Sequence, residues 1–600
     1  MSQWMIQMKS ADYKALTEKY GISPMLARII RNRGMVTDEE FGQYLNGTLD
    51  DLHDTSKMTD MVKACSLIQQ YISEGLKFRI IGDYDVDGIC STYILMRGLK
   101  KCGADVDYAI PHRVHDGYGI NDNLIDKAHE DGINVIITCD NGIAACDQVQ
   151  HAYNLGIHVI VTDHHEIPYD EDEDTGERLE ILPPAEAVVD PHREDDKYPF
   201  SGICGAVVAW KLIGLLLPMC GMSRTESDTL TGELLEEAAL ATVCDVMELK
   251  DENRIIVKEG LRRIQNTTNT GLRSLINAVG LDGKKITTYS FGFILGPCMN
   301  AAGRLDSASA SLELLLSEDK NEAALIAGKL KSYNDERKAV TETGIKRAIE
   351  DIENSPVGRN KVLVIYLAGV HESVVGLIAG KIRERYEKPV IVFTDGEEGI
   401  KGSGRSIEAY NMYEELAKHK DLYSKFGGHK MAAGLTLAGD DVDELRYRLN
   451  AACTLSDDDL VTKTMIDLEM PFKYVTYSFI EELTRLEPCG NGNPRPVFAL
   501  RGLRVERVKR GGNERSPLNV YVRDADNRRW NLKLFDRENA FLDGADAVYG
   551  MGTAGDLCDG TAEGVIIDVI YNPAVNEYRG ESNLELTVND YRFKKEDQDV

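Results

Sequence analysis

Short apolar runs alternate with longer helical stretches between residues 78 and 189. Five of these runs have the length and composition of buried strands: Phe78–Gly82, Val106–Ile110, Asn134–Cys139, His158–Thr162 and Ala187–Val189. Helix candidates lie between them at Ser91–Lys101, Asn121–Glu130 and Ala144–Asn154. Strands that alternate with helices in this way form a parallel sheet with helices on both faces. The pattern therefore predicts an α/β domain in the first third of the chain.

The pattern changes beyond this region and before it. Residues 1–55 have helical patterning with turn signals, and residues 206–355 are largely helical. Within the second of these regions, Glu322–Glu353 has strong helix formers and few breakers, which predicts one long helix. A second α/β unit begins with the apolar run Lys361–Ile365 and continues to about residue 455.

The last part of the chain has short strand candidates separated by Gly, Asp and Asn turns. They lie at Leu518–Arg523, Trp530–Phe535, Gly564–Tyr571 and Leu584–Val588. This spacing predicts a small antiparallel β-barrel. The fold class is therefore α/β with a C-terminal barrel, in five parts: a helical segment at 1–55, a parallel-sheet domain at 56–320, a connecting long helix at 321–355, a smaller α/β domain at 356–455 and the barrel at 460–592.

Charge and cysteine content narrow the class of protein. The 600 residues include 69 Lys and Arg against 99 Asp and Glu, so the formal net charge is -30. This balance argues against a uniformly basic nucleic-acid coat or a membrane-surface protein, although it leaves room for a local basic channel. The 12 cysteines form no C-x-x-C pair, the first residues lack a signal-peptide pattern, and no apolar stretch has the length of a membrane span. We expect a cytoplasmic protein with reduced thiols and no membrane contact.

Three carboxylates alternate directly after the first predicted strand, in the run Ile81–Gly88. Asp83, Asp85 and Asp87 followed by glycine copy the opening of an EF-hand calcium loop. That loop also needs a preceding helix and a bidentate Glu at its twelfth position. Here an apolar strand precedes the run and Ile94 occupies the twelfth position. The calcium-loop interpretation is therefore disfavoured.

Two further predicted strands also end in polar residues. The third strand leads into Asp140-Asn141-Gly142 and the fourth into Asp163-His164-His165. Because the carboxyl ends of parallel strands meet at one edge of a sheet, side chains far apart in sequence can converge there. We expect this convergence for four residues, with a fifth candidate after the helical stretch that ends near residue 241: Asp85, Asp87, Asp140 and His164, and then Asp245.

Such a set of side chains predicts a metal centre. Packed carboxylates repel one another and resist ionisation unless cations neutralise them. Oxygen ligands with one imidazole suit Mg²⁺ or Mn²⁺ better than zinc, which prefers more sulfur and nitrogen. Two such ions about 3.5–4 Å apart can bridge a phosphate and activate a water. We therefore expect two divalent ions at this edge of the sheet.

The three strand-end motifs resemble the signature of the DHH phosphoesterase superfamily, and within it the RecJ-type single-stranded-DNA-specific exonucleases. The resemblance extends over nearly the whole chain, from about residue 20 to 592. Supporting blocks are Ile110–Arg113, Gly117–Gly119, Gly296–Arg304, Ser403–Ser406, Gly427–His429 and Pro488–Pro494. The resemblance implies a DHH domain, a DHH-associated domain and an OB-fold for the three predicted folded parts.

The resemblance also implies roles for individual residues. The ions would lie on Asp85, Asp87, Asp140, His164 and Asp245, with Asp140 as the bridge. Asp163 would orient neighbouring groups, and His165 would act in the outer shell or contact phosphate. The implied activity is two-metal hydrolysis of single-stranded DNA from the 5′ end to 5′-mononucleotides, in DNA repair and recombination. A single-strand-binding protein and a repair helicase are the implied protein partners.

Two positions depart from the family pattern. Some superfamily members have a metal-binding His four residues before the first Asp of the pair, and this chain has Ile81 there. One metal would then use more water ligands or Asp83, whose role stays open. In addition, Val207 stands where the family usually has Gly. Neither departure touches the core carboxylates.

Polar and basic groups of the second α/β unit are candidates for holding nucleic acid. Ser403, Arg405 and His429 lie on apparent loops, and an Arg beside a Gly-rich turn can grip a phosphate while backbone N–H groups of Gly427 and Gly428 add donors. Arg113 and Arg304 are similar candidates on the side of the first domain.

The predicted barrel contains a basic cluster that the net charge conceals. Between residues 501 and 533 there are ten Arg and Lys residues against four acidic ones, with Tyr521 and Trp530 among them. Basic groups interleaved with aromatics suit single strands, whose bases stack and whose phosphates need counter-charge.

Two other functions fit this sequence less well. A phosphodiesterase for short oligonucleotides or cyclic dinucleotides would share both α/β units but would not need residues 460–592. A non-catalytic DNA-binding scaffold would lack metal ligands, whereas the set is intact here. A P-loop motor is excluded because no G-x-x-x-x-G-K-[ST] occurs. The sequence leaves preference for DNA over RNA undecided.

Overall fold

The computed structural model describes residues 3–113, 117–171, 178–305, 308–396, 399–439, 441–512, 516–535, 539–578 and 581–594. The chain divides into two compact units. One comprises Thr48–Val461, and the other joins Met1–Gly47 to Thr462–Val600. Across the described part of the chain, the helices are too short or too polar to cross a bilayer.

The first sheet of the larger unit is fully parallel, as predicted, with strand order β3-β2-β4-β5-β8. Its strands are β2 (Lys77–Ile81), β3 (Asp105–Ala109), β4 (Val135–Cys139), β5 (His158–Thr162) and β8 (Ala187–Val189). Ile81 pairs with Thr138, Cys139 with Thr162, and Thr162 with Val189, so the carboxyl ends lie level. A short hairpin of β6 (Tyr169–Glu171) and β7 (Arg178–Glu180) lies outside this sheet.

Helices cover this sheet and continue the domain. The crossover helices are α5 (Val86–Lys101), α6 (Asp122–Glu130) and α7 (Cys146–Asn154), and α4 (Met61–Ser73) precedes β2. The helical region after β8 contains α8 (Gly205–Met219), α9 (Arg224–Cys244), α10 (Asp251–Ile264), α11 (Thr270–Ala278), α12 (Thr288–Ser290), a π-helix (Phe291–Leu295), α13 (Gly296–Leu305) and α14 (Ser309–Leu316). Side chains of α5, α8 and α9 share one core cluster, so the helix that follows the Asp motif is buried on almost every side.

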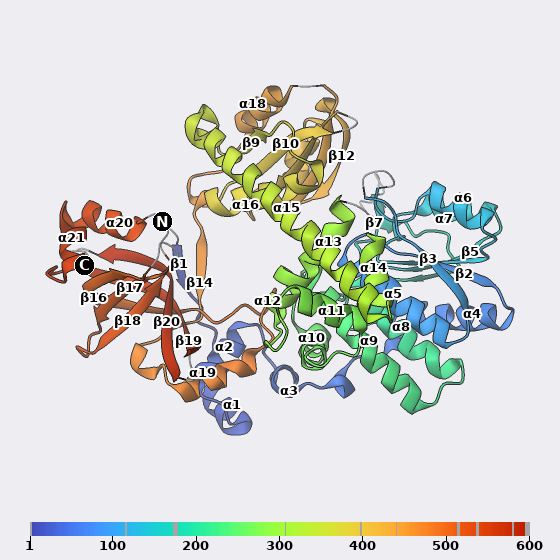
Figure 1. Cartoon of the computed structure of the whole chain (residues 1–600), viewed down its shortest axis with the longest axis horizontal. Coiled ribbons are helices and arrows are strands. Elements are labelled where there is room, and N and C mark those ends of the chain that lie inside the picture. Colours follow the sequence, from blue (N-terminus) through green and yellow to red (C-terminus); the bar gives the residue numbers. More distant parts are fainter. Residues whose placement is uncertain are drawn as a thin grey trace. The chain divides into compact units, whose positions relative to one another are not determined.

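A helix of 35 residues, α15 (Lys320–Asn354), leads from the first domain to the second sheet of the same unit (Figure 1). That sheet has the order β12-β13-β11-β10-β9 and mixes one parallel pair with three antiparallel ones. Its strands are β9 (Leu363–Tyr366), β10 (Val390–Gly396), β11 (Gly399–Arg405), β12 (Tyr423–His429) and β13 (Ala432–Leu437), with helices α16 (Glu372–Tyr386), α17 (Met412–Ala417) and α18 (Val442–Ala452).

The prediction of loops around Ser403, Arg405 and His429 is wrong. Ser403 and Arg405 lie on β11, and His429 is the last residue of β12. The glycines there permit close packing within the sheet. A Cβ at Gly402 would lie 2.4 Å from the ring of Phe393 on the neighbouring strand. A Gly-rich strand therefore resembles a loop in the sequence pattern.

The smaller unit contains a closed five-stranded barrel, β16-β17-β18-β20-β19, in which β19 pairs back to β16. Its strands are β16 (Phe498–Arg510), β17 (Leu518–Arg523), β18 (Arg529–Leu534), β19 (Ile566–Tyr578) and β20 (Glu581–Lys594). The barrel is not wholly antiparallel, because β18 and β20 run parallel where the barrel closes. Helices α20 (Ala540–Tyr549) and α21 (Thr553–Asp559) make this possible by separating β18 from the β19–β20 hairpin.

The N-terminal segment is not purely helical, and it belongs to the barrel unit. Gln3–Ile6 forms β1, which pairs in parallel with β14 (Lys463–Ile466). Helices α1 (Tyr13–Tyr20), α2 (Pro24–Asn32) and α3 (Asp38–Asn46) follow. Leu26 and Ile29 share a core cluster with Phe498 of the barrel. Four residues are too few for a reliable strand pattern, and the partner strand lies far away in the sequence.

Candidate metal centre

The predicted side chains converge at the carboxyl edge of the first sheet. Asp140 follows β4 directly and adopts a left-handed backbone with φ of 60°, a conformation that costs free energy for a non-glycine residue. Asn141 holds the neighbouring strand ends, since its Nδ2 donates to the carbonyls of Ile81 (3.0 Å) and Cys139 (2.9 Å). These contacts between the Asn141 side chain and the backbone hold the strand ends in place independently of the metal ligands.

Helix termini orient the carboxylates that follow β2. Asp85 caps α5: its Oδ1 accepts from the backbone N–H groups of Asp87 (2.9 Å) and Gly88 (3.1 Å). Asp87 in turn accepts from the first residues of α8, Gly205 (2.7 Å) and Ala206 (2.8 Å). The N-termini of α5 and α8 thus both point at this cluster, where their dipoles favour negative charge.

His164 lies at the centre of the cluster. Its Nε2 is 3.1 Å from Asp140 Oδ1, 3.5 Å from Asp87 Oδ2 and 3.7 Å from Asp245 Oδ2. Asp245 is the C-cap of α9, so a helix end supplies the ligand that the strands do not. The sequence-predicted set from three strand ends and one helix end is therefore brought together within a single cluster.

The cluster holds more negative charge than its surroundings compensate. Burial, and then the charges of Asp87 and Asp85, raise the pKa of Asp140 well above its ordinary value. Burial and the same two neighbours raise the pKa of Asp245 to about 8. Burial and Asp85 raise the pKa of Asp83 to about 8. Ionised carboxylates at this edge therefore need a cationic partner.

The donor set fits hard divalent cations. Three groups of side chains have ligand atoms within 4.8 Å of one another: Asp140, His164 and His165; Asp87, His164 and Asp245; Asp83, Asp85 and Asp140. Asp140 and His164 each belong to two groups. Both oxygens of Asp83 are buried without a hydrogen-bond partner at normal geometry, which is the situation that a cation resolves. Mostly oxygen ligands with imidazole suit Mg²⁺ or Mn²⁺.

His165 differs from His164 in exposure and charge. Its Nδ1 lies 2.8 Å from Asp163 Oδ1, and nearly half of its side chain is exposed. Burial lowers the pKa of His165, but the hydrogen bond and charge of Asp163 outweigh burial and raise this pKa to about 9. Burial raises the pKa of Asp163, yet His165 and His164 lower it overall. At neutral pH the pair is an imidazolium held by a carboxylate, at the open side of the cluster.

Tyr118 adds a contact that sequence reasoning did not assign. Its hydroxyl donates to the backbone carbonyl of Asp140 (2.6 Å) and lies 3.2 Å from His165 Nε2. Burial and the charge of Asp140 raise the pKa of Tyr118, so the hydroxyl keeps its proton. Tyr118 therefore supports the strained residue at the centre of the site. In the sequence, the Gly117-Tyr118-Gly119 block is the feature that marks this position.

A second feature of the same unit is a cationic pocket of about 300 Å³ between α13, α16 and the second sheet. Its polar and charged lining comprises Arg113, Arg304, Glu372, Ser373, Lys401, Ser403, Arg405 and Thr436. Arg304 donates to the carbonyl of Ser373 (2.5 Å), and Arg405 donates to Ser403 Oγ (3.1 Å). Four predicted nucleic-acid contacts from distant parts of the chain therefore line one pocket.

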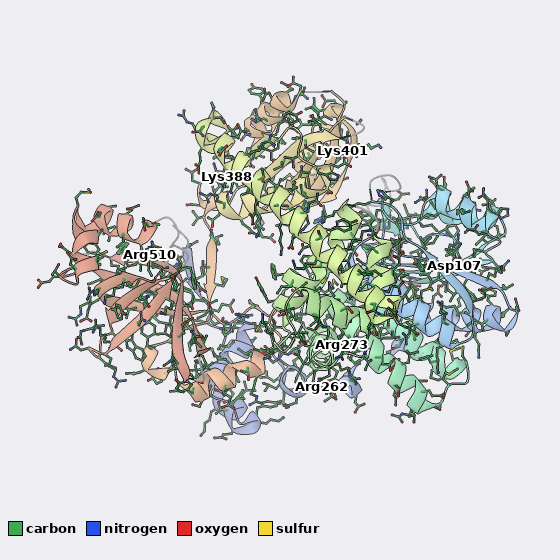
Figure 2. All side chains as sticks on the ribbon, in the orientation of Figure 1. Asp107, Arg262, Arg273, Lys388, Lys401 and Arg510 are labelled. Atoms are coloured by element: carbon green, nitrogen blue, oxygen red, sulfur yellow. The ribbon has the colours of Figure 1, made fainter. Side chains whose placement is uncertain are left out.

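The cations of this pocket are incompletely neutralised. Burial, and then the charges of Arg113 and Arg337, lower the pKa of Arg304. Burial and Arg113 likewise lower the pKa of Arg405. Lys401, labelled in Figure 2, is the exception, since its Nζ lies 2.9 Å from Glu372 Oε2. A Cβ at Gly376 of α16 would lie 2.9 Å from Arg405 and Ser403, so only glycine leaves this space open. Such a pocket is suited to a phosphate.

The glycines and His429 of β12 lie outside this pocket but on the same sheet. His429 and Arg405 both pair with Ala432 of β13, from its two sides. Gly427 and Ser403 both pair with Gly434 in the same manner. These residues therefore form cross-strand rows with the pocket residues, two strand spacings apart, or about 10 Å.

The barrel carries the predicted basic cluster on the outer face of β16, β17 and β18. Register places three rows across these strands: Lys509, Asn519 and Lys533; Arg507, Tyr521 and Asn531; Arg504, Arg523 and Arg529. Arg529 lies over the ring of Tyr521 at 5.1 Å. Arg510, labelled in Figure 2, ends β16.

The two aromatic residues predicted in this cluster separate in the structure. Trp530 does not join the basic face, because it packs inward against Phe472 (5.4 Å between ring centroids) and donates from Nε1 to Asp524 Oδ2 (2.8 Å). Only Tyr521 lies among the outward basic side chains. The alternation of β18 explains the difference, since Trp530 and Lys533 are three residues apart and point to opposite faces.

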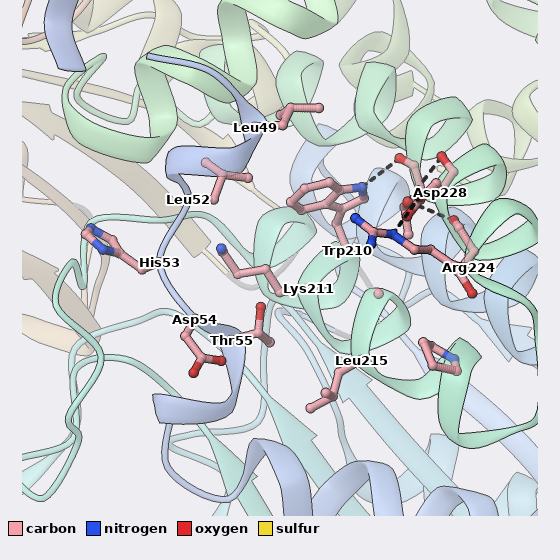
Figure 3. Close-up of a pocket in the computed structure, with 14 residues that line it drawn as sticks. Leu49, Leu52, His53, Asp54, Thr55, Trp210, Lys211, Leu215, Arg224 and Asp228 are labelled. Carbon is pink, nitrogen blue, oxygen red and sulfur yellow. Dashed lines mark hydrogen bonds and ion pairs between the residues drawn. The ribbon is translucent and has the colours of Figure 1, made fainter. Parts of the chain in front are cut away.

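A larger pocket of about 650 Å³ lies elsewhere in the first domain, around Trp210 (Figure 3). Its charged groups are already paired: Lys211 Nζ lies 2.9 Å from Glu252 Oε1, and Arg224 lies 3.6 Å from Asp228. Trp210 donates to the carbonyl of Thr231 (2.8 Å). None of the three metal-ligand groups found in the described residues touches it. The metal-ligand groups of the described residues therefore lie at the sheet edge and not in this pocket.

Comparison with models of known protein families finds three matches along the chain. A model of the DHH family, N-terminal domain, matches residues 77–242. The DHHA1 domain matches residues 359–454, and the RecJ OB domain matches residues 466–590.

Individual relatives extend the similarity over most of the chain. The single-stranded-DNA-specific exonuclease RecJ of Bacillus subtilis is 35% identical over 98% of this chain and 70% of that protein. The corresponding protein of Escherichia coli is 33% identical over 80% of this chain and 83% of its own length. The crystal structure of RecJ from Thermus thermophilus in complex with Mn²⁺ has a TM-score of 0.79 and 27% identity, and covers 98% of this chain and 79% of that one.

Proposed function

The chain belongs to the RecJ family of single-stranded-DNA-specific exonucleases, and we propose that it degrades single-stranded DNA from the 5′ end to 5′-mononucleotides. The observation that carries the proposal is the pair of sites within one unit. A buried cluster of carboxylates and imidazoles lies in the same unit as a cationic pocket that fits a phosphate. The closed barrel adds a third element, which the shorter phosphodiesterases do not need.

Asp85, Asp87, Asp140, His164 and Asp245 are the proposed metal ligands, with Asp83 as a sixth. When bound, Mg²⁺ or Mn²⁺ would neutralise the phosphodiester and supply an activated water for its hydrolysis. Relatives have been crystallised with both ions. Asp140 is the proposed ligand shared by two ions, because it belongs to the group with Asp83 and Asp85, and its Oδ1 also lies 3.1 Å from His164 of the group with Asp87 and Asp245. Tyr118 and the helix N-termini keep these residues in place.

His165 has a different proposed role. It is held by Asp163 and protonated at neutral pH, so it can donate to a phosphate oxygen at the open side of the cluster. Asp163 keeps the imidazole oriented and charged, in the manner of an outer-shell carboxylate.

The cationic pocket is the proposed site of a phosphate near the end of the strand. Arg113, Arg304 and Arg405 would bind it bidentately, with Ser403 as a further donor. Gly427, Gly428 and His429 would hold the strand along the same sheet. Binding of a terminal phosphate by this pocket would set the polarity of digestion, since it places the end of the strand beside the metals. The family resemblance suggests that this end is the 5′ end.

Each domain has its own proposed role. We propose that residues 56–320 carry the chemistry, that 356–455 hold the strand end by way of the helix at 321–355, and that the barrel at 460–592 binds the following nucleotides. A protein of this kind would act in the cytoplasm, in DNA repair and recombination. A repair helicase would supply its single strands, and a single-strand-binding protein would share them.

Digestion assays test the proposal. End-labelled single-stranded DNA, duplex DNA and RNA of one sequence are incubated with Mg²⁺, Mn²⁺ or chelator, and the products are identified. We expect mononucleotides from single-stranded DNA with either metal, none with chelator, and little product from blunt duplex. Cleavage that persists in chelator would overturn the metal assignment. Equal digestion of duplex would overturn the strand preference.

A further inference from the structure

Helices α5 and α8 lie side by side and end in the same way (Figure 1). Cys102 is the C-cap of α5, and Cys220 is the C-cap of α8. Each cysteine is followed by a glycine in the left-handed conformation, Gly103 with φ of 88° and Gly221 with φ of 84°. The chain therefore leaves both helices with the same backbone geometry, which glycine permits at this position. Neither cysteine has a part in the proposed function.

The two helices also begin together and touch along their length, so the two cysteines lie next to each other. Asp87, in the first turn of α5, accepts from the backbone N–H groups of Gly205 (2.7 Å) and Ala206 (2.8 Å) at the start of α8. Farther along, a Cβ at Gly98 would lie 2.3 Å from Cδ1 of Ile213, so the helices are in close contact there. α5 has 16 residues and α8 has 15. Helices of nearly equal length that run in the same direction bring their last residues side by side.

A cluster of thiols forms at this end of the helix pair. Burial raises the pKa of Cys102, and the neighbouring thiol of Cys220 raises it further. Cys65 of α4 is the third member: its Sγ lies 3.6 Å from the carbonyl of Leu212, and burial and then Cys220 raise its pKa to about 12. Cys102 and Cys220 are partly exposed, whereas Cys65 is buried. A small reagent therefore reaches the first two thiols but not the third.

We propose that Cys102 and Cys220 form a reversible disulfide that controls the metal centre. A low-molecular-weight disulfide is the oxidant: one cysteine thiolate attacks it and releases one thiol, and the second cysteine then displaces the other thiol as the bond between the two cysteines forms. Two protein thiols are thus oxidised, and the external disulfide is reduced to two thiols, which take up the two protons. Because the exchange needs a thiolate and Cys102 is protonated at neutral pH, the reaction is slow and the reduced form is the resting state.

The bond acts on the metal centre through the contact between the helices. A disulfide joins its sulfurs at about 2.05 Å, which is shorter than any contact between two thiols, so it draws the cysteine ends of α5 and α8 together. Gly98 and Ile213 touch about one to two helical turns from the cysteines and about two to three turns from the Asp87 end. With this contact as a fulcrum, closure at one end separates the other end, where Asp87 binds the first N–H groups of α8. The regulation, although not the bond itself, rests on the proposed function.

Mapping the bond tests the site directly. The full-length protein is incubated with oxidised glutathione, and the peptides of a non-reducing digest are identified by mass spectrometry. We expect a bond between Cys102 and Cys220 that dithiothreitol reverses, and none after Cys102→Ser or Cys220→Ser. Cys558→Ser, which removes an exposed thiol from the barrel unit, is the matched control and should leave the bond intact. Glutathione adducts without the bond, or bonds between other cysteines only, would overturn the proposal.

Two readouts connect the bond to the metal centre. In the oxidised protein we expect single-strand digestion to fall on the order of 10-fold or more, because a displacement of about 1 Å can cost about 100-fold in rate. Mn²⁺ affinity, measured by titration in the absence of DNA, should fall as well. Cys102→Ser should keep both properties in oxidant, and Cys558→Ser should be as sensitive as wild type.

The same readouts separate this inference from the proposed function. Unchanged Mn²⁺ affinity in a protein that carries the bond would overturn control of the metal centre. A reduced wild type that binds Mn²⁺ but digests no strand would contradict the proposed function, while the mapped bond and the Mn²⁺ titration would still decide the inference.

Discussion

At the edge of the first sheet, carboxylates and imidazoles lie buried within a few ångströms of one another, whereas the basic side chains of the barrel stand in exposed rows. Asp140 and Asp87 are almost fully buried and held by backbone contacts, while Arg504 and Lys509 are open to solvent. In the buried cluster every ligand depends on its neighbours through charge and position. On the barrel each cation acts through a screened interaction of its own. A single substitution at the metal centre should therefore abolish its function, whereas each substitution on the barrel should have a small effect on DNA binding.

The largest effect should follow from Asp140→Ala. This change removes a ligand shared by two ligand groups, so nuclease activity should fall by on the order of 10³-fold or more, even at saturating Mn²⁺. The metal-free variant should unfold at the same temperature as wild type or above it, because an ionised Asp140 is costly among Asp85 and Asp87. Activity assays and thermal unfolding in chelator measure the two effects. Asp147→Ala, at an exposed site in the same domain, is the control, and near-normal turnover in Asp140→Ala would contradict the shared-ligand assignment.

An intermediate effect should follow from Arg405→Ala. Loss of a charge-assisted contact in the pocket should raise KM by about 10- to 100-fold. Metal affinity, measured by titration of Mn²⁺, should stay unchanged, because Arg405 belongs to none of the ligand groups. Arg405→Lys keeps the charge but not the bidentate geometry and should recover part of the loss. A variant that lost metal affinity more than substrate affinity would show that Arg405 acts through the metal centre and not through the phosphate pocket.

Smaller, additive effects are expected on the barrel. Arg504→Gln, Lys509→Gln and Lys533→Gln should each reduce the salt dependence of single-strand binding by about 0.7 in log–log slope. Arg523→Gln should change the slope less, since Arg523 is already paired with Glu506. Fluorescence anisotropy over a salt series measures the slopes, and kcat should not change. Slopes equal to that of wild type in all variants would show that this basic face does not contact the phosphates of DNA.

The smallest effect on activity is expected for a buried carboxylate outside the metal centre, Glu237. Its substitution should instead change the stability of the protein. Burial and Glu236 raise the pKa of Glu237 on α9 to about 8. Because its folded-state pKa exceeds its unfolded value, the folded protein loses stability as pH rises from about 4.5 to about 8, by at most roughly 1.4 kcal/mol per pH unit. Glu237→Gln should remove this slope at saturating Mg²⁺ and leave kcat unchanged. Chemical denaturation at several pH values measures it, and identical slopes in both proteins would contradict the assignment.

The sequence predicts the convergence of side chains at the sheet edge well, because strand order and motif position are local signals. A strand that ends in Asp140 or in Asp163-His164-His165 is recognisable from a few residues, and parallel pairing brings such ends together. The Gly117-Tyr118-Gly119 block marks Tyr118 in the sequence, but it does not show that the Tyr118 hydroxyl binds the carbonyl of Asp140, because that contact forms only once the strand ends have come together.

The sequence predicts the other regions less completely because pairing there is long-range. Glycine in β11 reads as a loop signal, although it serves close packing against Phe393. The strand at Gln3–Ile6 needs a partner at Lys463–Ile466, and Arg113, Arg304 and Arg405 meet only once three distant segments have folded. Trp530 looks like a binding residue until the barrel alternation turns it inward.

The central claim is that the metal centre and the phosphate pocket act together on the 5′ end of a single strand. The most direct measurement is digestion of one linear strand, labelled in parallel at its 5′ or its 3′ end, alongside the same sequence as a circle. The account predicts immediate release of the 5′ label as a mononucleotide, late release of the 3′ label, and an intact circle. Early release of the 3′ label, or digestion of the circle at a comparable rate, would contradict it.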